Sequence, residues 1–153
     1  MTRTYETGED VTLAFFDAWN AKDLDGLADL FVEDADFVNV VGFWWTTRRQ
    51  IRKAHDYGFR KIFQEARVEI IALKSRVLGN DVEVVHTVST LDGQTDENGI
   101  TAGQRTAVIT IVAHRQREGG FRIVSCHNTD RVDGADTHLN TDAGFRPASY
   151  QTG

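Results

Sequence analysis

The order of the hydrophobic patterns along the chain is the feature that most restricts its fold. Three stretches with helical periodicity come first, at 8–21, 23–31 and 46–66, and four β-rich stretches follow at 67–78, 81–91, 103–117 and 121–130. Helices followed by consecutive strands are typical of an α+β fold, because the helices then pack on one face of the sheet. A length of 153 residues suits a single domain.

The helical stretches are amphipathic. In the first, Phe15 and Trp19 lie on the same side of a helix, four residues apart. Asp23 is a good N-cap for the second helix. We expect that helix to run through Phe31 and to be broken by the acidic residues at 34–36.

The β-rich stretches predict a meander. Gly79-Asn80 and Gly119-Gly120 are tight-turn signals between neighbouring strands, and the polar link 92–102 is longer. A further apolar strand is expected at 37–45, before the third helix. We place the domain at residues 1–131 and expect 132–153 to be a polar tail, partly ordered at most or covering a neighbour.

Both faces of the predicted sheet are apolar. In the stretch 103–117, Ile109 and Ile111 alternate with Val108 and Val112. One layer of helices covers only one face, so either the tail or a second subunit must cover the other. Of these alternatives we favour a homodimer through the outer sheet face.

Composition excludes several classes of protein. The formal net charge of −6 gives no bulk attraction to nucleic acid or anionic lipid. No stretch approaches the roughly 20 apolar residues that span a bilayer, and the polar N-terminal segment does not resemble a signal peptide. Cys126 is the only cysteine, so no internal disulfide is possible, and we expect a cytoplasmic protein.

The charge is unevenly distributed. Residues 1–36 contain ten acidic residues against two basic ones, whereas residues 46–67 contain seven basic residues against two acidic ones. Solvated helix faces that attract one another explain this pattern most simply. The alternative is a basic docking face for an acidic carrier or ligand.

Strong catalytic motifs are absent from the sequence. There is no phosphate-binding glycine loop, dinucleotide fingerprint, nucleophile-elbow serine or zincin helix. The five histidines lack metal-type spacing, so we expect no metal site. Cys126 lies in the middle of a predicted strand among apolar neighbours, where a cysteine usually serves packing.

The functional signal consists of polar side chains at positions where the pattern calls for apolar ones. The candidates, which come from four different elements, are His55, Asn39, His86, His127 and Asn128. A single residue of this kind is most often a satisfied core residue. Several together indicate an apolar pocket with a few convergent polar groups, which is typical of a small-molecule site.

Strand alternation constrains two of these candidates. His127 and Asn128 are neighbours, so their side chains point to opposite faces unless a bulge intervenes. Strict alternation groups His127 with Ile123, and Asn128 with Cys126. A pocket histidine would act as acid or base, because imidazole exchanges protons near neutral pH.

Aromatic residues would form the walls of such a pocket. They are Phe15, Phe16, Trp19, Phe43, Trp44, Trp45, Phe59 and Phe63. The simpler interpretation is that most of them belong to the core. For substrate binding we select Phe15, Trp19, Trp44, Trp45, Phe59 and His86.

Three stretches carry a resemblance to known proteins. They are DFVNVVGFW at 36–44, the helical residues Ile51, His55 and Phe59, and FRIVSCHNT at 121–129. With the order of elements, they resemble the nuclear transport factor 2-like superfamily, which includes ketosteroid isomerases and SnoaL-type polyketide cyclases. More narrowly, they resemble the SgcJ/EcaC group, known from enediyne biosynthesis clusters.

This resemblance implies a cone-shaped, cystatin-like α+β barrel, in which three N-terminal helices pack on a curved antiparallel sheet. It also implies a homodimer, one pocket per cone and no cofactor. The ketosteroid isomerase mechanism is not carried over, because we place no matching pocket acids on these strands.

Two kinds of function agree with these observations. The first is cofactor-free acid–base cyclisation, isomerisation or dehydration of an apolar, polyketide-like substrate, in which His55 or His127 moves the proton and Asn39 or Asn128 holds an oxygen. The alternative is non-catalytic binding of a hydrophobic metabolite, or a dimeric association module. Fold alone does not choose between them.

Overall fold

Helix α1 (Gly8–Ala21) begins at a capping box. The Thr7 hydroxyl accepts a hydrogen bond from the Asp10 amide at 3.0 Å, and the Asp10 carboxylate accepts one from the Thr7 amide at 3.1 Å. The chain leaves the helix at Lys22, which adopts a left-handed conformation. Asp23 then caps the short helix α2 (Leu24–Asp29) through the Gly26 amide, as the sequence predicts. The computed structural model describes residues 3–151.

Strand β1 (Phe31–Val38) begins earlier than the sequence predicts. Helix α2 ends at Asp29, and the acidic residues expected to break a helix lie within the strand instead. The expectation of one strand at 37–45 is also wrong, because a turn separates β1 from the two-residue strand β2 (Trp44–Trp45). The reason is tertiary: β1 pairs in parallel with a distant strand, starting with Phe31 beside Ile123.

Helix α3 (Arg48–Lys61) is shorter than predicted. The amides of Ile62 and Phe63 both bond to the Gly58 carbonyl, at 2.9 and 2.8 Å, and this turn ends the helix. Gly58 leaves room for the Phe63 ring, since an added Cβ atom would lie 3.1 Å from Phe63 Cδ2. The lack of a side chain at Gly58 therefore lets the chain fold back on the helix.

The charge asymmetry of the sequence corresponds to contacts between neighbouring elements. Arg52 on α3 forms a salt bridge with Asp25 on α2 at 2.7 Å, and Arg48 forms one with Glu33 on β1 at 2.9 Å. These pairs agree with attraction between solvated faces, the simpler of the two interpretations. Because they are largely exposed, each contributes little to stability.

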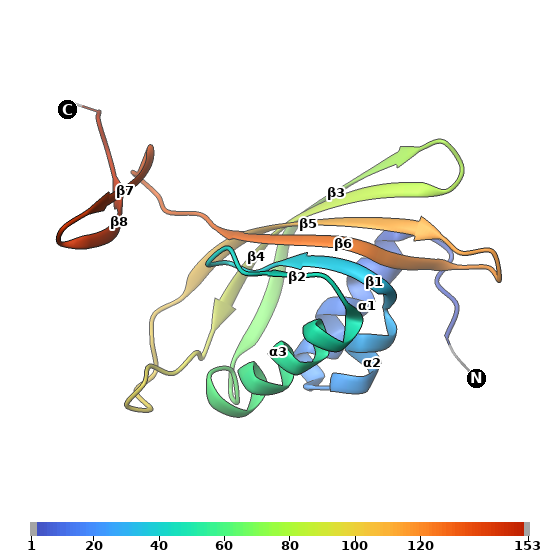
Figure 1. Ribbon diagram of the computed structural model, residues 1–153, viewed down its shortest axis with the longest axis horizontal. Helices are drawn as coiled ribbons and strands as arrows, with labels where there is room; N and C mark the ends of the chain where they lie inside the picture. The colour runs from blue at the N-terminus through green and yellow to red at the C-terminus, as the bar shows by residue number, and fades with distance from the viewer. Residues whose placement is uncertain (1–2, 152–153) are drawn as a thin grey trace.

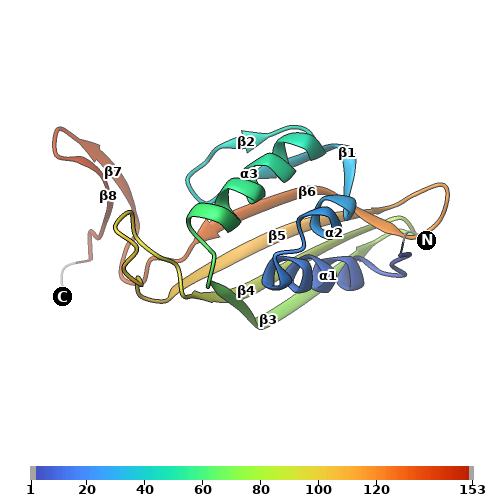
Figure 2. The same ribbon diagram turned by 90° about the horizontal axis from the view of Figure 1, so that it is seen from below.

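The predicted meander is confirmed. Strands β3 (Arg67–Leu78), β4 (Val82–Asp92), β5 (Arg105–Arg115) and β6 (Phe121–Asp130) pair antiparallel in sequence order. The complete sheet has the order β2-β1-β6-β5-β4-β3. All three helices lie on its concave side (Figures 1 and 2), which confirms the cystatin-like α+β fold.

The segment after residue 131 contains regular structure that the sequence did not predict. Strands β7 (Thr137–Thr141) and β8 (Gly144–Ala148) form a separate hairpin. Figure 1 shows this hairpin beyond the end of the main sheet, on the side away from the helices. Thus the tail does not cover the outer face of its own sheet. Among residues 3–151, no helix is long and apolar enough to cross a membrane.

The N-terminus of α1 is attached to the sheet by a buried carboxylate. Glu83 on β4, 7% exposed, accepts hydrogen bonds from the amides of Gly8 at 2.8 Å and Glu9 at 3.3 Å, and from Ser75 Oγ at 3.3 Å. A negative charge at this position also interacts favourably with the positive, N-terminal end of the α1 dipole. The contact is close, since a Cβ atom on Gly8 would lie 2.5 Å from Glu83 Cβ.

We expect Gly8→Ala to destabilise the protein by about 1–3 kcal/mol, because the added methyl group overpacks the contact with Glu83. Helix propensity alone predicts the opposite sign. Gly103→Ala is the matched control, since a Cβ atom there has no neighbour within 4 Å. Chemical denaturation measures the free energy of unfolding of both variants. A Gly8→Ala variant that is as stable as the wild type would contradict this description of the contact.

Candidate functional site

His55 lies on the side of α3 that faces the sheet, in register with the buried residues Ile51 and Phe59. Its imidazole is surrounded by aromatic rings from four different elements. The distances from its centroid are 5.3 Å to Phe37, 6.0 Å to Phe59, 6.2 Å to Phe15 and 6.4 Å to Trp45. Three of these rings, Phe15, Trp45 and Phe59, are among the residues proposed from the sequence as pocket walls, whereas Phe37 is not.

The hydrogen bonding of His55 defines its tautomer. Nδ1 lies 2.8 Å from the carbonyl oxygen of Ile51, which can only accept, so Nδ1 carries the proton. Nε2 is then a hydrogen-bond acceptor, and it has no hydrogen-bond partner among the residues that the structure describes. Enclosure by the rings lowers the pKa of His55, and the bond to Ile51 offsets part of that effect.

A β-bulge in β6 decides which polar side chains join His55. Val112 on β5 pairs with Ser125, but the next residue, Ala113, pairs with Ile123, so Val124 is the extra residue. The inward positions are therefore Ile123 before the bulge and Cys126 after it, both of which are buried.

Asn128 follows Cys126 on the inward face of β6. It pairs with Ile109, while Cys126 pairs with Phe37 of the His55 cluster. The Asn128 Oδ1 atom is buried and has no hydrogen-bond partner within residues 3–151. Asn128 thus brings an unsatisfied polar group to the same face of the sheet as the His55 cluster.

His127 points the other way. The residue is exposed, on the outer side of β6, and does not share a face with Ile123 as strict alternation predicts. The bulge is the physical reason, because one extra residue shifts the alternation for the rest of the strand. The grouping of Asn128 with Cys126 is correct.

Asn39 is engaged in the turn between β1 and β2. Its side-chain oxygen accepts hydrogen bonds from the amides of Phe43 at 2.8 Å and Val41 at 3.2 Å. This use of a side-chain oxygen is typical of turns. The structure therefore gives Asn39 a local hydrogen-bonding role, separate from the His55 cluster.

The aromatic residues selected for binding divide between the two faces. Phe15 and Trp19 on α1 and Phe59 on α3 are buried on the sheet side of their helices. Trp45 is half-buried beside Phe37. Trp44, by contrast, is 66% exposed, and its Nε1 donates to the carboxylate of Asp36 at 2.7 Å.

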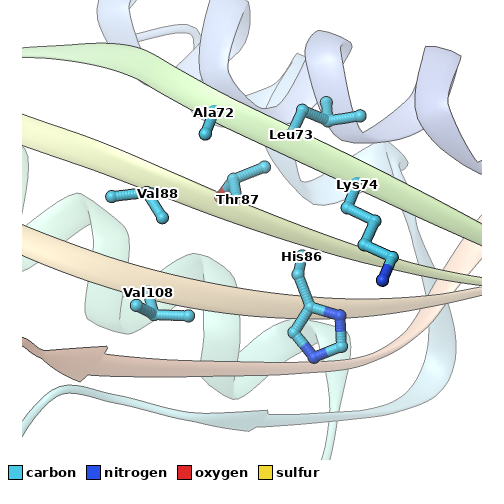
Figure 3. Close-up of a pocket in the computed structure, with 7 residues that line it drawn as sticks. All are labelled: Ala72, Leu73, Lys74, His86, Thr87, Val88 and Val108. Atoms are coloured by element: carbon cyan, nitrogen blue, oxygen red, sulfur yellow. The ribbon is translucent and has the colours of Figure 1, made fainter.

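His86 also lies on the outer face. It lines a shallow hollow together with Lys74, Val88 and Val108, among others. Figure 3 shows these side chains in front of the sheet, with the helices behind it. The concave face thus holds His55, Asn128, Phe15, Trp19, Trp45 and Phe59, whereas His86, His127 and Trp44 lie outside it.

One charged group on the concave side was not predicted. Asp130 follows Asn128 on the same face of β6, and Arg105 NH1 donates to both of its carboxylate oxygens at 2.7 Å. Gln94 accepts from the same guanidinium at 2.9 Å. The sequence offers one signal for this pair. Arg105 begins β5 and Asp130 ends β6, and in a meander the start of one strand lies beside the end of the next.

Other chemistries receive no support from the described residues. Burial raises the pKa of the Cys126 thiol, so this cysteine is not an activated nucleophile. Within residues 3–151, no group of three or more His, Cys, Asp or Glu side chains is placed to hold a metal ion. The polar groups on the concave face that we consider for function are the His55 imidazole, the Asn128 carboxamide and the Arg105–Asp130 pair.

The sequence profile of the SnoaL-like domain matches residues 12–126, which include His55 and the start of the inward row on β6. No curated protein sequence matches the chain.

Solved structures share the fold. An uncharacterised protein with a cystatin-like fold from Caulobacter vibrioides is 27% identical, with a TM-score of 0.75 over 82% of this chain and 87% of that one. A domain of unknown function from Nostoc punctiforme is 25% identical, with a TM-score of 0.66 over 80% and 74%. A ketosteroid isomerase-like protein from Erwinia carotovora atroseptica is 11% identical, with a TM-score of 0.68 over 81% and 93%, and shows the fold alone.

The lowered pKa of His55 makes stability depend on pH. Below about pH 6.5 the unfolded chain binds a proton at His55 before the folded protein does. The free energy of unfolding therefore falls as the pH drops toward the folded pKa, by at most about 1.4 kcal/mol per pH unit from this group.

Denaturation of the wild type and of His55→Phe between pH 8 and pH 5 measures this contribution, and the variant should show a shallower dependence. Phe121→Leu is the control, because Phe121 is buried in the core but is not one of the rings around His55, so this change should lower stability at every pH without changing the slope. Identical slopes for wild type and His55→Phe would contradict the enclosure of His55.

Proposed function

This chain is a member of the SnoaL-like domain family, and from that premise we propose that its concave face binds a small, mostly apolar molecule and transfers protons on it without a cofactor. The observation that carries the proposal is the state of His55. Its Nδ1 is fixed by Ile51, which leaves Nε2 as an acceptor within a cluster of aromatic rings. A neutral imidazole held in one orientation is suited to general-base catalysis.

The proposed reaction begins at a carbon next to a carbonyl group. His55 Nε2 takes a proton from that carbon, and the electron pair of the C–H bond moves toward the carbonyl oxygen to form an enolate. The side-chain amide of Asn128 donates a hydrogen bond to that oxygen. Where the enolate is conjugated with a carbon–carbon double bond, His55 returns the proton to the far carbon of that system, which gives isomerisation. Where the β-carbon carries a hydroxyl group, the His55 imidazolium protonates that group and it leaves as water, which gives dehydration. Attack of the enolate carbon on a second carbonyl group forms a carbon–carbon bond, and the resulting alkoxide takes the proton back from the imidazolium, which gives cyclisation.

Polyketide-like ketones are the substrate class that we propose. Their repeated carbonyl groups acidify the intervening carbons, and their cyclic products have flat apolar faces that match rings such as Phe37 and Trp45. The SgcJ/EcaC-like residues at 36–44 and 121–129 support an origin in specialised, enediyne-type metabolism. The Arg105–Asp130 pair lies farther along the same face, where it can contact a polar end of the substrate.

Binding without catalysis is the second candidate. It is favoured by the same enclosure, because a lowered pKa makes His55 a weaker base and aromatic walls suit simple shielding of a metabolite. The two candidates differ in whether a bound ketone exchanges its protons.

Exchange of the α-protons of 2-tetralone in D₂O, followed by ¹H NMR, tests the proposal. We expect the protein to accelerate exchange and His55→Gln to reduce that acceleration by about 100-fold, because the base is lost. Asn128→Leu, which removes the hydrogen bond to the enolate oxygen, should also reduce it by about 100-fold. His114→Gln, a matched change at an exposed histidine, should have no effect.

The outcomes separate the alternatives. Loss of exchange in His127→Gln rather than in His55→Gln would contradict the placement of the site on the concave face. Binding of 2-tetralone without accelerated exchange, detected by quenching of tryptophan fluorescence, would favour the non-catalytic binder.

We further propose that the protein is a homodimer through the outer sheet face. Four valines, Val84, Val88, Val108 and Val112, lie half-buried on that face. Neither the helices nor the β7–β8 hairpin lies over the outer face of the sheet (Figure 1). Burial of a contiguous apolar surface is the common driving force for stable self-association.

Val112→Asp should convert such a dimer to a monomer, because it places a charge in the centre of the buried valines. Ile100→Asp is the control, since Ile100 is 65% exposed in the loop between β4 and β5. Sedimentation velocity measures the result, with circular dichroism to verify folding. A Val112→Asp variant that stays dimeric would place the interface elsewhere.

A further inference from the structure

Strand register aligns the outward side chains in rows across the sheet. One row runs from β1 to β3 through Val38, His127, Thr110, His86 and Lys74. The neighbouring row runs through Asp36, Ser125, Val112, Val84 and Arg76. Each row therefore begins on the β1 edge and ends on a basic residue at the β3 edge.

The two edges of this face differ in chemistry. The β1 edge carries the half-buried carboxylate of Asp36 and the exposed indole of Trp44, which are hydrogen-bonded to each other. The β3 edge carries Lys74 and Arg76, both exposed, and neither has an ion-pair partner in the part of the chain that the structure describes. Between the edges the rows contain no acid, lysine or arginine.

Strand β5 lies midway between β1 and β3, with β6 and β1 on one side and β4 and β3 on the other, and the two-residue strand β2 lies beyond β1. Resting on the homodimer proposed above, we propose that two copies pack outer face to outer face about a two-fold axis parallel to β5. The β1 edge of each copy then lies over the β3 edge of the other.

This axis makes the face self-complementary. It preserves each row and reverses its direction, so Asp36 of one copy faces Arg76 of the second copy, and the reverse pair forms at the other edge. Trp44 falls beside Lys74 of the second copy, where an indole face can receive an ammonium group. The valines of β5 then face their own copies at the axis, and the valines of β4 lie over β6 of the second copy, in the manner of two packed sheets about 10 Å apart.

The other two-fold arrangement within this interface is disfavoured by the same charges. An axis perpendicular to the strands would place the β3 edge over itself, with Lys74 and Arg76 opposite their own copies. Like charges opposed at an interface repel one another and weaken association, whereas opposed unlike charges fix the register.

Charge reversal tests the edge pairing. Asp36→Lys and Arg76→Glu should each weaken dimerisation at least tenfold, because each creates two like-charge pairs. The double variant Asp36→Lys/Arg76→Glu restores unlike pairs and should return the dissociation constant to within about threefold of wild type. Sedimentation equilibrium at low salt measures all three constants. Glu97→Lys and Arg49→Glu, reversals at exposed positions off this face, are the matched controls.

Three results would overturn the inference. Single variants that dimerise as well as wild type would show that the edges do not cross, while the outer-face dimer would stand. A folded double variant whose dimerisation does not recover would have the same meaning. Asp36→Asn is the folding control, because it keeps a hydrogen-bond acceptor for Trp44 and so identifies any loss of dimer that is due to misfolding. A wild type that stays monomeric would overturn the homodimer itself, and with it this geometry.

Discussion

The extra residue Val124 in β6 is the constraint on which the use of the two sheet faces depends. Without it, His127 would point toward the helices and Asn128 toward solvent. With it, the row Cys126, Asn128 and Asp130 turns inward, and His127 turns outward. One bulge thus gives the concave face a carboxamide and a carboxylate, and leaves the outer face with side chains suited to a second copy.

The concave face shows how a nearly apolar site can hold a base. Four rings enclose His55, and the resulting loss of solvation keeps its imidazole neutral. The bond to Ile51 then fixes which nitrogen accepts a proton. The aromatic cluster therefore packs α3 against the sheet and also sets the electrostatics of the histidine, so the core and the proposed site share the same residues.

Much of this arrangement follows from the sequence, because periodicity and turn residues are local signals. Strands β3 and β6 have the predicted bounds. Three of the rings beside His55, those of Phe15, Trp45 and Phe59, come from the residues proposed as pocket walls. The start of β1 was missed, because its pairing with β6 joins segments about 90 residues apart. The bulge at Val124 was missed because the alternation of side chains along a strand does not reveal where an extra residue interrupts the pairing. Asn39 could equally have been a turn or a site residue, since the same carboxamide serves both.

The central claim is that His55 is a neutral imidazole with its proton on Nδ1 and an available Nε2. Long-range ¹H–¹⁵N correlation NMR on histidine-labelled protein at pH 7 measures this most directly, with His55→Phe to assign the signal. The account predicts the Nδ1–H tautomer, with an unprotonated Nε2 that changes its shift when 2-tetralone binds. A charged imidazolium, or the Nε2–H tautomer, would contradict it.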